Sequence, residues 1–349
     1  MLLFYLHHPA HFHLFKNTIR RLKAAGHEVC IVATKKDVLE ELLSAEGWTY
    51  ENFLPHGRKD NVFSIAMGLL KQDWRLLKKC LQRRPALMIG TATEITHIGF
   101  LLRIPNIFVN EDDADVVPLV KKLAHPFAKY LLAPDVCNTK SPKKTITYAG
   151  YHELAYLHPD VFTPDAEVVK KYFDPADRYF IIRFAKLKAH HDSGAKGINR
   201  QVALRLIELL KPYGKIYITA EREMEADFEP YRLKIAPIDM HHVMAFADLY
   251  IGDSQTMAAE SGVLGVPFIR YNDFVGRIGY LKDLEDVYQL GFGIRPGNES
   301  ELYSTVTQLV EDPDWKAKWK VKREKMLQHK IDVTSFFVEV IEKTLNRQI

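Results

Sequence analysis

The stretch ADLYIGDSQTMAAESGVLGVPFIRY, residues 247–271, predicts a strand, a polar turn, a helix and a second strand in direct succession. The apolar run 249–251 suits a buried parallel strand. The pair 253–254, Asp-Ser, supplies N-cap chemistry after a turn-forming glycine. The small-residue helix 256–264 ends at Gly265, and 266–270 begins the next strand. This succession is typical of an open parallel α/β sheet.

The same alternation runs through the chain in two series, separated by the proline-containing connection 150–178. In the first series we expect strands at 2–6, 27–34, 48–53, 86–89, 106–110, 130–132 and 145–149, with helices at 12–25, 37–46, 62–81 and 95–102. In the second series we expect strands at 179–184, 215–219, 231–236, 249–251 and 266–270, and helices at 199–210, 239–247, 256–264, 281–290 and 299–310, followed by a helical tail at 315–346 that breaks near Ile331. The sequence therefore predicts two open α/β halves whose strand ends line a shared cleft.

Composition excludes several classes of protein. The chain has 349 residues, 47% of them hydrophobic and 26% charged, which is the balance of a globular protein large enough for two domains. A formal net charge of +4 is too small to imply nucleic acid. The three cysteines, Cys30, Cys80 and Cys137, form neither a zinc motif nor a disulfide framework, so we expect a reducing cytoplasm. No stretch approaches the roughly 20 apolar residues that cross a bilayer.

Four histidines, His7, His8, His11 and His13, follow the end of the first predicted strand. A helix start beside histidine suits a phosphate, or a general base for a hydroxyl. A metal site is an alternative, although no carboxylate or cysteine stands at ligand spacing. The histidines could also cap the first helix and do nothing more.

The acidic run 111–115, Glu-Asp-Asp-Ala-Asp, follows the strand predicted at 106–110. Carboxylates at a helix start are favoured by the helix dipole, which is a purely structural explanation. Alternatively, clustered carboxylates raise one another's pKa and act as a general base, or they bind sugar hydroxyls. The run is not a calcium loop, because it lacks the glycine and the distal glutamate.

Arg183 ends the first strand of the second series, where a pyrophosphate could lie. The loop that follows carries Lys186, Lys188, Ser193, Gly194, Lys196 and Gly197. Cations and glycine amides hold phosphates without a metal, although the P-loop pattern is absent and the loop could simply be solvated. The helix start at 253–254 also attracts anions, and Glu260 could accept hydrogen bonds from sugar hydroxyls. A capping role for 253–254 and a solvated Glu260 are the alternative.

A basic segment, residues 316–330, lies in the helical tail. It could touch an anionic membrane, but a solvated helix face explains it better, because no clean apolar face opposes the positive residues.

Several patches together resemble a prokaryotic family of unknown function, the domain of unknown function 354 family. They are HHPAHFHLFKN at 7–17 with GHEV at 26–29, GYHELAYLHP at 150–159, and GDSQTMAAE at 252–260. The family is similar to two-domain GT-B proteins, which include nucleotide-sugar glycosyltransferases and the non-hydrolysing UDP-N-acetylglucosamine 2-epimerases. The resemblance implies two Rossmann-like open-sheet domains that face each other across a cleft.

The resemblance also divides the chain. It implies an N-terminal Rossmann-like acceptor-side domain at 1–165 and a C-terminal Rossmann-like nucleotide-sugar-binding domain at 178–330. Residues 331–349 would form a C-terminal helix that packs back on the N-terminal domain.

Residue roles are carried over position by position. Residues 252–254 look like the segment that holds the nucleotide's phosphates, Glu260 like the binder of the ribose, and His241 like part of the loop on the base. We predict that the nucleotide sugar is bound by Arg183, Ser193, Gly194, Ile238, Met240, His241, Asp253, Ser254, Gln255, Thr256 and Glu260. We predict that catalysis depends on His11, Glu111 and Asp113, and we expect no metal.

The comparison with the epimerases also shows departures. Where these enzymes have His-Gly-Asp-Thr, this chain has Ile-Gly-Thr-Ala at 89–92, and their later His-Val-Glu-Ala-Gly becomes Phe-Val-Asn-Glu-Asp at 108–112. Only Glu111 keeps a carboxylate, displaced by one position. Epimerisation needs acid and base groups on both faces of the sugar, so these losses argue against that activity.

The sequence therefore predicts a metal-independent glycosyltransferase that uses a nucleotide-diphosphate sugar, with a UDP-sugar favoured and no further cofactor. We expect a glycan or lipid-linked acceptor in cell-surface polysaccharide or glycolipid synthesis, no nucleic acid, and a cytoplasmic protein that could lie at the inner face of the membrane. An epimerase-like isomerase or hydrolase and a non-catalytic nucleotide-sugar-binding protein are the alternatives.

Overall fold

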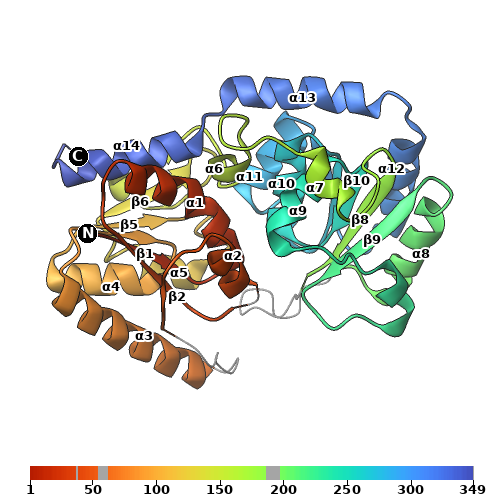
Figure 1. The fold of residues 1–349 in the computed structure, drawn as a ribbon. Helices are drawn as coiled ribbons and strands as arrows, with labels where there is room; N and C mark the ends of the chain where they lie inside the picture. The colour runs from red at the N-terminus through yellow and green to blue at the C-terminus, as the bar shows by residue number, and fades with distance from the viewer. Residues whose placement is uncertain (37, 54–61, 186–196, 349) are drawn as a thin grey trace. The chain divides into compact units, whose positions relative to one another are not determined.

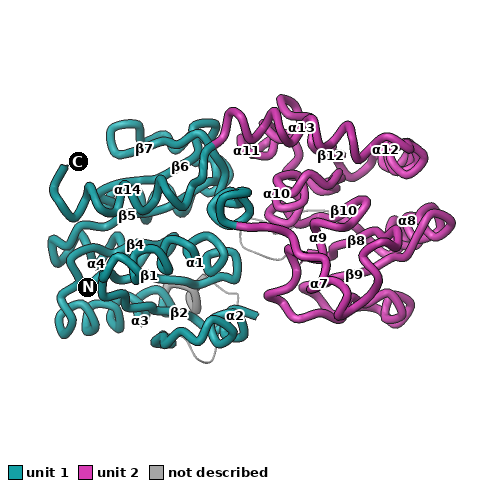
Figure 2. Tube along the Cα trace, turned by 45° about the horizontal axis from the view of Figure 1, so that its top comes forward, with its two compact units in different colours: residues 1–161, 331–349 teal, residues 162–330 magenta. Residues whose placement is uncertain are grey.

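The computed structural model describes residues 1–348 except residue 37 and residues 54–61 and 186–196, and for residues 62–66 it describes the backbone alone. The chain divides into two compact units (Figure 2). The first unit comprises Met1–Val161 together with Ile331–Ile349, and the second comprises Phe162–Lys330. Each unit is a parallel sheet covered by helices (Figure 1), so the α/β prediction is confirmed.

Within the described residues, the first unit has a seven-stranded parallel sheet. Its spatial order is β3 (Glu51–Asn52), β2 (Val29–Ala33), β1 (Leu2–Leu6), β4 (Leu87–Gly90), β5 (Asn106–Val109), β6 (Tyr130–Pro134) and β7 (Thr145–Tyr148). Its helices are α1 (Pro9–Ala24), α2 (Leu39–Ala45), α3 (Val62–Arg83), α4 (Thr93–Leu102), α5 (Pro118–Leu123), η1 (Pro142–Lys144), α6 (Leu154–Leu157) and α14 (Val333–Leu345). The strand predicted at 48–53 is shorter than expected, and α1 begins three residues before the predicted helix.

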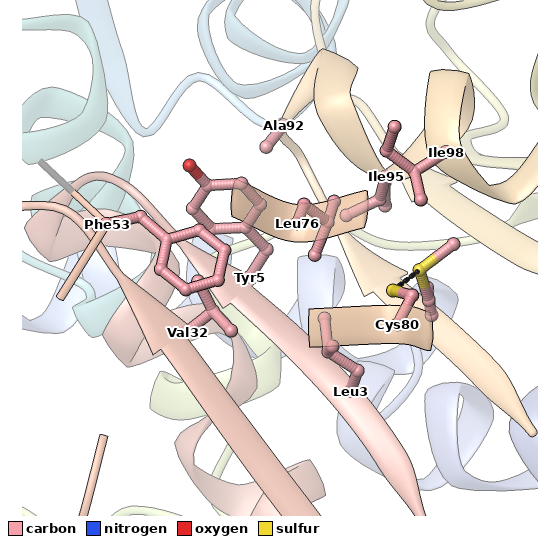
Figure 3. Packing of buried hydrophobic residues seen from close by; sticks show 10 residues of the cluster. Leu3, Tyr5, Val32, Phe53, Leu76, Cys80, Ala92, Ile95 and Ile98 are labelled. Atoms are coloured by element: carbon pink, nitrogen blue, oxygen red, sulfur yellow. Dashed lines mark hydrogen bonds between the residues drawn. The ribbon is translucent and has the colours of Figure 1, made fainter. Parts of the chain in front are cut away.

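The core of the first unit forms where α3 packs on the centre of the sheet. The side chains of Leu76 and Cys80 on α3 are buried against Leu3 and Tyr5 of β1 (Figure 3). The Tyr5 hydroxyl donates to Gln72 Oε1 at 2.8 Å, which satisfies a polar group inside this apolar cluster. The inner face of α3 is therefore fixed on the sheet by both apolar and polar contacts.

The second unit has a five-stranded parallel sheet as far as the chain is described. Its spatial order is β12 (Gly291–Ile294), β11 (Phe268–Tyr271), β10 (Leu249–Gly252), β8 (Tyr179–Phe184) and β9 (Lys215–Ala220). Its helices are α7 (Ala166–Lys170), α8 (Arg200–Leu210), η2 (Ala226–Tyr231), η3 (Pro237–Asp239), α9 (Met240–Ala245), α10 (Gln255–Leu264), α11 (Gly279–Lys282), η4 (Asp283–Val287), α12 (Glu299–Glu311) and α13 (Trp315–His329).

The stretch 247–271 forms β10, α10 and β11 in the centre of this sheet, as predicted. The Ser254 side chain caps α10 by accepting from the amide of Met257, and Gly265 ends the helix with φ of 84°. This left-handed conformation favours glycine, since a Cβ would clash with the backbone. Gly262 lies where an added Cβ would come within 2.8 Å of the Phe268 ring, so the small residues of α10 allow it to pack closely on β11.

One expectation for the second unit was wrong, and one strand was missed. Residues 231–236 do not form a strand; only a single bridge joins Arg232 to Ile218. Pro230 and Pro237 bracket this segment, and proline cannot donate to a ladder. Conversely, β12 was not expected, because two of its residues are glycine. An added Cβ at Gly291 would come within 2.4 Å of the Phe268 ring, so glycine lets this edge strand approach its neighbour.

The helical tail breaks between α13 and α14, near the predicted position. Helix α13 belongs to the second unit, whereas α14 lies against α1 and α6 of the first. Asp332 caps α14 and also pairs with Arg21 of α1 at 3.1 Å. None of the helices in the described part of the chain combines the length and the apolar character needed to cross a membrane.

Candidate functional site

The carboxyl ends of β8 and β10 place Arg183 and Asp253 at the same edge of the second sheet. Parallel strands bring the loops that follow them to one edge, which is where ligands bind in open α/β sheets. Gly252 allows the close approach there, since an added Cβ would lie 2.9 Å from Arg183 Cβ and 2.3 Å from the Tyr250 hydroxyl oxygen. The predicted phosphate-binding region is thus crowded, and its polar groups lie close together.

Asp253 holds both ends of the loop that follows β8. Its carboxylate accepts from the amide of Ala185 at 2.5 Å and from the amide of Ile198 at 3.2 Å. The side chain is 2% exposed, and burial raises its pKa to about 6 even though these two amides favour the charged form. The predicted ligands Ser193 and Gly194 belong to this loop and lie outside the described residues. Asp253 therefore fixes where the loop begins and ends.

A chain of hydrogen-bonded side chains, which we did not predict from the sequence, connects to the backbone of Asp253. Arg270 is fully buried and forms two hydrogen bonds with the Glu285 carboxylate, at 2.9 and 3.1 Å. Asn272 accepts from Arg270 and donates to the backbone carbonyl of Asp253 at 3.0 Å. The only sequence signal was a charged residue in an apolar strand, since Arg270 ends the run Val-Pro-Phe-Ile.

Among the described residues, one donor of the Arg183 side chain has no acceptor. Its terminal nitrogens donate to Thr219 Oγ1 at 3.1 Å and to Glu221 Oε1 at 2.6 Å. Its Nε and the nearby Tyr250 hydroxyl are both buried and have no hydrogen-bond partner within the described structure. Burial raises the pKa of Tyr250 well above its ordinary value, so the hydroxyl keeps its proton. Two buried donors at one sheet edge could thus serve an anionic acceptor.

Glu260 and His241, two predicted ligands from different helices, are brought together. Glu260 Oε1 lies 3.0 Å from His241 Nε2, and both residues are buried. The other predicted ligands of this group are half-buried: Ile238 and Met240 beside the start of α9, and Ser254, Gln255 and Thr256 at the start of α10. Binding of the ribose by Glu260 stays a prediction. It requires that the carboxylate bind the ribose hydroxyls while it keeps its contact with His241 Nε2.

In the first unit, His8 caps α1 and His11 lies one turn into it. His8 Nδ1 accepts from the amide of Ala10 at 3.2 Å. Both ring nitrogens of His11 lie 3.0 Å from the hydroxyl of Thr91, and its Nδ1 accepts weakly from the amide of His7. Burial, followed by the neighbouring histidines, lowers the pKa of His11 well below its ordinary value. His11 is therefore neutral at physiological pH.

Glu111 contacts His152, a residue to which we assigned no role from the sequence. Glu111 Oε2 lies 3.2 Å from His152 Nδ1 and accepts from the backbone amide of His152 at 3.2 Å. Burial lowers the pKa of His152 to about 3, so the ring is neutral and its contact with Glu111 is not an ion pair. The other ring nitrogen, Nε2, is buried without a partner among the described residues.

Two other carboxylates of the acidic run contact the segment that follows β6. Asp113 accepts from the amide of Asn138 at 2.8 Å, and Asp115 pairs with Lys140 at 2.5 Å on the surface. The role that we predicted for Asp113 in catalysis stays a prediction, although one of its oxygens already serves the backbone. Among the residues with described positions, no group of three or more His, Cys, Asp or Glu side chains is arranged to hold a metal ion.

Comparison with solved structures shows the same fold over nearly the whole chain. The UDP-GlcNAc 2-epimerase of Neisseria meningitidis, bound to UDP-GlcNAc, is 15% identical with a TM-score of 0.66, and 99% of each chain is covered. A putative UDP-N-acetylglucosamine 2-epimerase of Listeria monocytogenes is 11% identical with a TM-score of 0.71, over 99% of this chain and 97% of that one. A spinosyn rhamnosyltransferase complexed with thymidine diphosphate is 14% identical with a TM-score of 0.63, over 98% and 100%. The chain thus has the GT-B fold, as the resemblance implied.

Sequence comparisons give a family without an activity. Residues 4–281 match the model of a family described as "Protein of unknown function (DUF354)". No curated protein matches the chain.

Proposed function

Since this chain belongs to the DUF354 family and has the GT-B fold, we propose that it is a metal-independent glycosyltransferase that uses a nucleotide-diphosphate sugar. A UDP-sugar is the favoured donor, and a glycan or lipid-linked acceptor of cell-surface polysaccharide or glycolipid synthesis is the favoured acceptor. No additional cofactor is needed for this chemistry.

One observation carries the proposal: the pair of buried, unpartnered donors at the edge of the second sheet. Arg183 Nε and the Tyr250 hydroxyl lack an acceptor within the described residues, and a buried donor without an acceptor costs free energy. Diphosphate oxygens are strong acceptors that would satisfy both groups. The Arg183 guanidinium and the helix start at Ser254 would also offset the charge that develops on the leaving diphosphate.

The first unit would supply the base that removes the proton of the acceptor hydroxyl. Glu111 lies beside the neutral His152 ring, whose unpartnered nitrogen can accept a proton, and the carboxylate would stabilise the imidazolium that forms against the burial that lowers its pKa. His11 is the base that we predicted from the sequence, and its ring nitrogens already contact Thr91 and His7. We therefore assign proton removal to His152, with Glu111 as the residue that positions it and His11 as a neighbouring polar contact.

Epimerisation or hydrolysis of a nucleotide sugar is the second candidate. It is favoured by the TM-scores, which are higher for the two epimerases than for the rhamnosyltransferase. The epimerase reaction would need a second acid or base on the opposite face of the sugar, where the aspartate of the epimerase turn is replaced by Thr91.

Nucleotide binding is the first test. Melting temperatures would be measured with UDP, GDP, CDP and dTDP, because a ligand that binds only the folded state raises the melting temperature. We expect a shift with one of them, largest with UDP, and a smaller shift in Arg183→Ala. Arg205→Ala, which removes an exposed arginine of the same unit, is the matched control. No shift with any nucleotide would exclude the proposal.

The second test separates the candidate reactions. The protein would be incubated with UDP-N-acetylglucosamine and no acceptor, and the sugar would be followed by nuclear magnetic resonance. A transferase leaves the donor largely intact until an acceptor glycan or lipid extract is added. Conversion to a new nucleotide sugar would favour the epimerase, and release of free sugar the hydrolase.

A further inference from the structure

Helix α3 has two apolar faces, and only the inner one is covered by the part of the chain that the structure describes. Its inner face packs on the sheet through Leu76 and Cys80, both at most 1% exposed. With 3.6 residues per turn, Trp74 lies on the opposite side of the helix from these residues. Figure 1 shows α3 at the outside of the first unit, next to α4.

The outer face carries a continuous apolar stripe. Met67, Trp74 and Leu81 repeat every seven residues, and Leu70 lies between the first two, so all four follow one line along the helix. Their exposed fractions are 41% for Met67, 63% for Trp74, 58% for Leu81 and 61% for Leu70. Single exposed apolar residues are common, but a stripe that includes a tryptophan indicates a binding surface.

Basic residues border this stripe. Lys71 and Lys78 are exposed and flank Trp74 on one side of the stripe, about one turn before it and one turn after it, and Lys78 Nζ is 5.9 Å from the Trp74 ring centroid. Between residues 67 and 84 the chain has six basic residues and a single acidic one, whereas the whole chain has 48 basic and 44 acidic residues. That acidic residue, Asp73, is already engaged with His97 of α4 at 3.1 Å. One of the six, Lys79, is buried and paired with Glu51, so the positive charge that borders the stripe comes chiefly from Lys71 and Lys78.

We propose that the outer face of α3, defined by Met67, Leu70, Lys71, Trp74, Lys78 and Leu81, docks on an anionic lipid surface. An apolar stripe with tryptophan enters the boundary between headgroups and acyl chains, while bordering lysines contact acidic headgroups. The neighbouring helix α4 exposes Phe100 and Leu101 and would add apolar area. This docking does not depend on the activity proposed above.

A second copy of the chain is the competing occupant, and the charge pattern disfavours it. In a two-fold contact between two α3 helices, the same surface meets itself, so Lys71 and Lys78 of both copies would approach one another. Juxtaposed like charges oppose association, whereas anionic lipid neutralises them. The basic segment of α13, which first suggested membrane contact, has Trp315, Trp319 and Met326 turned into the protein and lacks an exposed apolar stripe.

Vesicle binding tests the proposal with the whole protein. The probe is a set of vesicles made from equal parts of phosphatidylglycerol and phosphatidylcholine, compared with phosphatidylcholine alone, in a sedimentation assay at low and high salt. Trp74 also serves as a reporter, because Trp315 and Trp319 are buried and Trp48 is only half-exposed. We expect binding to the anionic vesicles only, weakened by salt, with a blue shift of tryptophan emission.

Two variants of α3 and one matched control separate lipid docking through α3 from non-specific adsorption to vesicles. Leu70→Ser/Trp74→Ser and Lys71→Glu/Lys78→Glu should each weaken binding by about tenfold or more, because each removes one half of the interaction. Lys320→Glu/Val321→Ser alters an equally exposed valine and lysine on α13 and should bind like the unchanged protein. All replaced side chains are exposed, and circular dichroism would confirm that each variant is folded.

Three results would overturn the proposal. They are absence of binding to anionic vesicles, binding that both α3 variants leave unchanged, and a dimer in solution that the α3 variants split while vesicles are not bound. The last result would assign the stripe to a second copy. Loss of binding in both α3 variants and not in the α13 control supports lipid docking whether or not nucleotide sugars are turned over.

Discussion

The edges of the two sheets use polar side chains in opposite ways. At the second sheet, Asp253 and Arg270 are buried and bonded to the protein's own backbone or to a partner carboxylate. At the first sheet, His11 and His152 are neutral rings. Only His152 lies beside a carboxylate, that of Glu111, and it keeps a nitrogen without a partner among the described residues. The edge of the second sheet is held by internal hydrogen bonds and keeps a few donors without a partner among the described residues. The edge of the first sheet carries neutral histidines that can accept protons.

This difference shows why the residue type alone does not assign a role. Asp253 and Glu111 are both carboxylates that follow a strand, yet Asp253 accepts from two loop amides while Glu111 fixes a histidine. Mutations that remove support should therefore act on stability, and mutations that remove proton acceptors should act on the rate.

The largest expected effect is on the support of the second sheet. Glu285→Ala leaves the Arg270 guanidinium, which is fully buried, without its counterion. Removing one partner of a buried ion pair lowers the unfolding free energy by about 3–5 kcal/mol. Urea denaturation followed by circular dichroism would measure the loss. Glu208→Ala is the control, because it removes the carboxylate of an exposed ion pair with Arg205. It should leave the midpoint of urea unfolding almost unchanged. Equal effects of the two substitutions would mean that the buried pair gives no support.

The next effect is on the proposed proton acceptor of the first unit. His152→Ala and Glu111→Gln should each lower kcat by about a hundredfold to a thousandfold with little change in KM, because both act on one proton transfer. The double variant should be no slower than His152→Ala. Asp115→Asn, a carboxylate-to-amide change in the same acidic run, is the control.

Multiplicative losses in the double variant would contradict the pairing of Glu111 with His152. A full rate in His152→Ala combined with a loss in His11→Ala would return the role of base to His11. Single-turnover kinetics of glycosyl transfer would distinguish these outcomes from slow product release.

A smaller effect concerns the pH dependence of stability through Asp253. Its pKa is raised from 3.8 to about 6 in the folded protein, so between these values the folded state binds more protons than the unfolded state. The contribution of Asp253 to the unfolding free energy of the protein is therefore greatest below pH 3.8, and it falls as the pH rises through about 6. The change amounts to at most about 3 kcal/mol, since one pKa unit corresponds to about 1.4 kcal/mol.

Asp253→Asn isolates this contribution. Its unfolding free energy, measured in urea at several pH values, should lack the decline through pH 6 that the unchanged protein shows. Asp227→Asn replaces an exposed carboxylate in the same unit and should keep the decline. Parallel curves for Asp253→Asn and the unchanged protein would show that Asp253 titrates normally.

Local patterns in the sequence predicted the strand, helix and strand of 247–271. The apolar pattern, the N-cap residue and the terminal glycine all indicate the same element boundaries there. They failed where the pattern and the chain geometry conflict. The alternation of residues 231–236 suggests a strand, but the flanking prolines leave only one bridge. The edge strand β12 needs glycine for packing, and glycine carries no strand signal.

The site was only partly predictable for a related reason. The sequence places Arg183, Asp253 and Glu260 in the right region, since parallel strands bring their loops to one edge. It does not show that Asp253 turns toward Ala185, or that His152 reaches Glu111, because these contacts join residues far apart in the chain. Long-range partners decide whether a carboxylate supports, binds or reacts.

The smallest effect has an unusual sign. Tyr250→Phe removes a buried hydroxyl that has no partner within the described structure, so it should raise the unfolding free energy by about 1 kcal/mol while weakening nucleotide-diphosphate binding several-fold. Tyr179→Phe is the matched control in the neighbouring strand, because its buried hydroxyl donates to the Val243 carbonyl at 2.5 Å and its loss should cost about 1 kcal/mol. Urea denaturation gives the stabilities and calorimetry the nucleotide affinities. If both tyrosines prove equally stabilising, the Tyr250 hydroxyl is satisfied in solution and is not a donor held for a ligand.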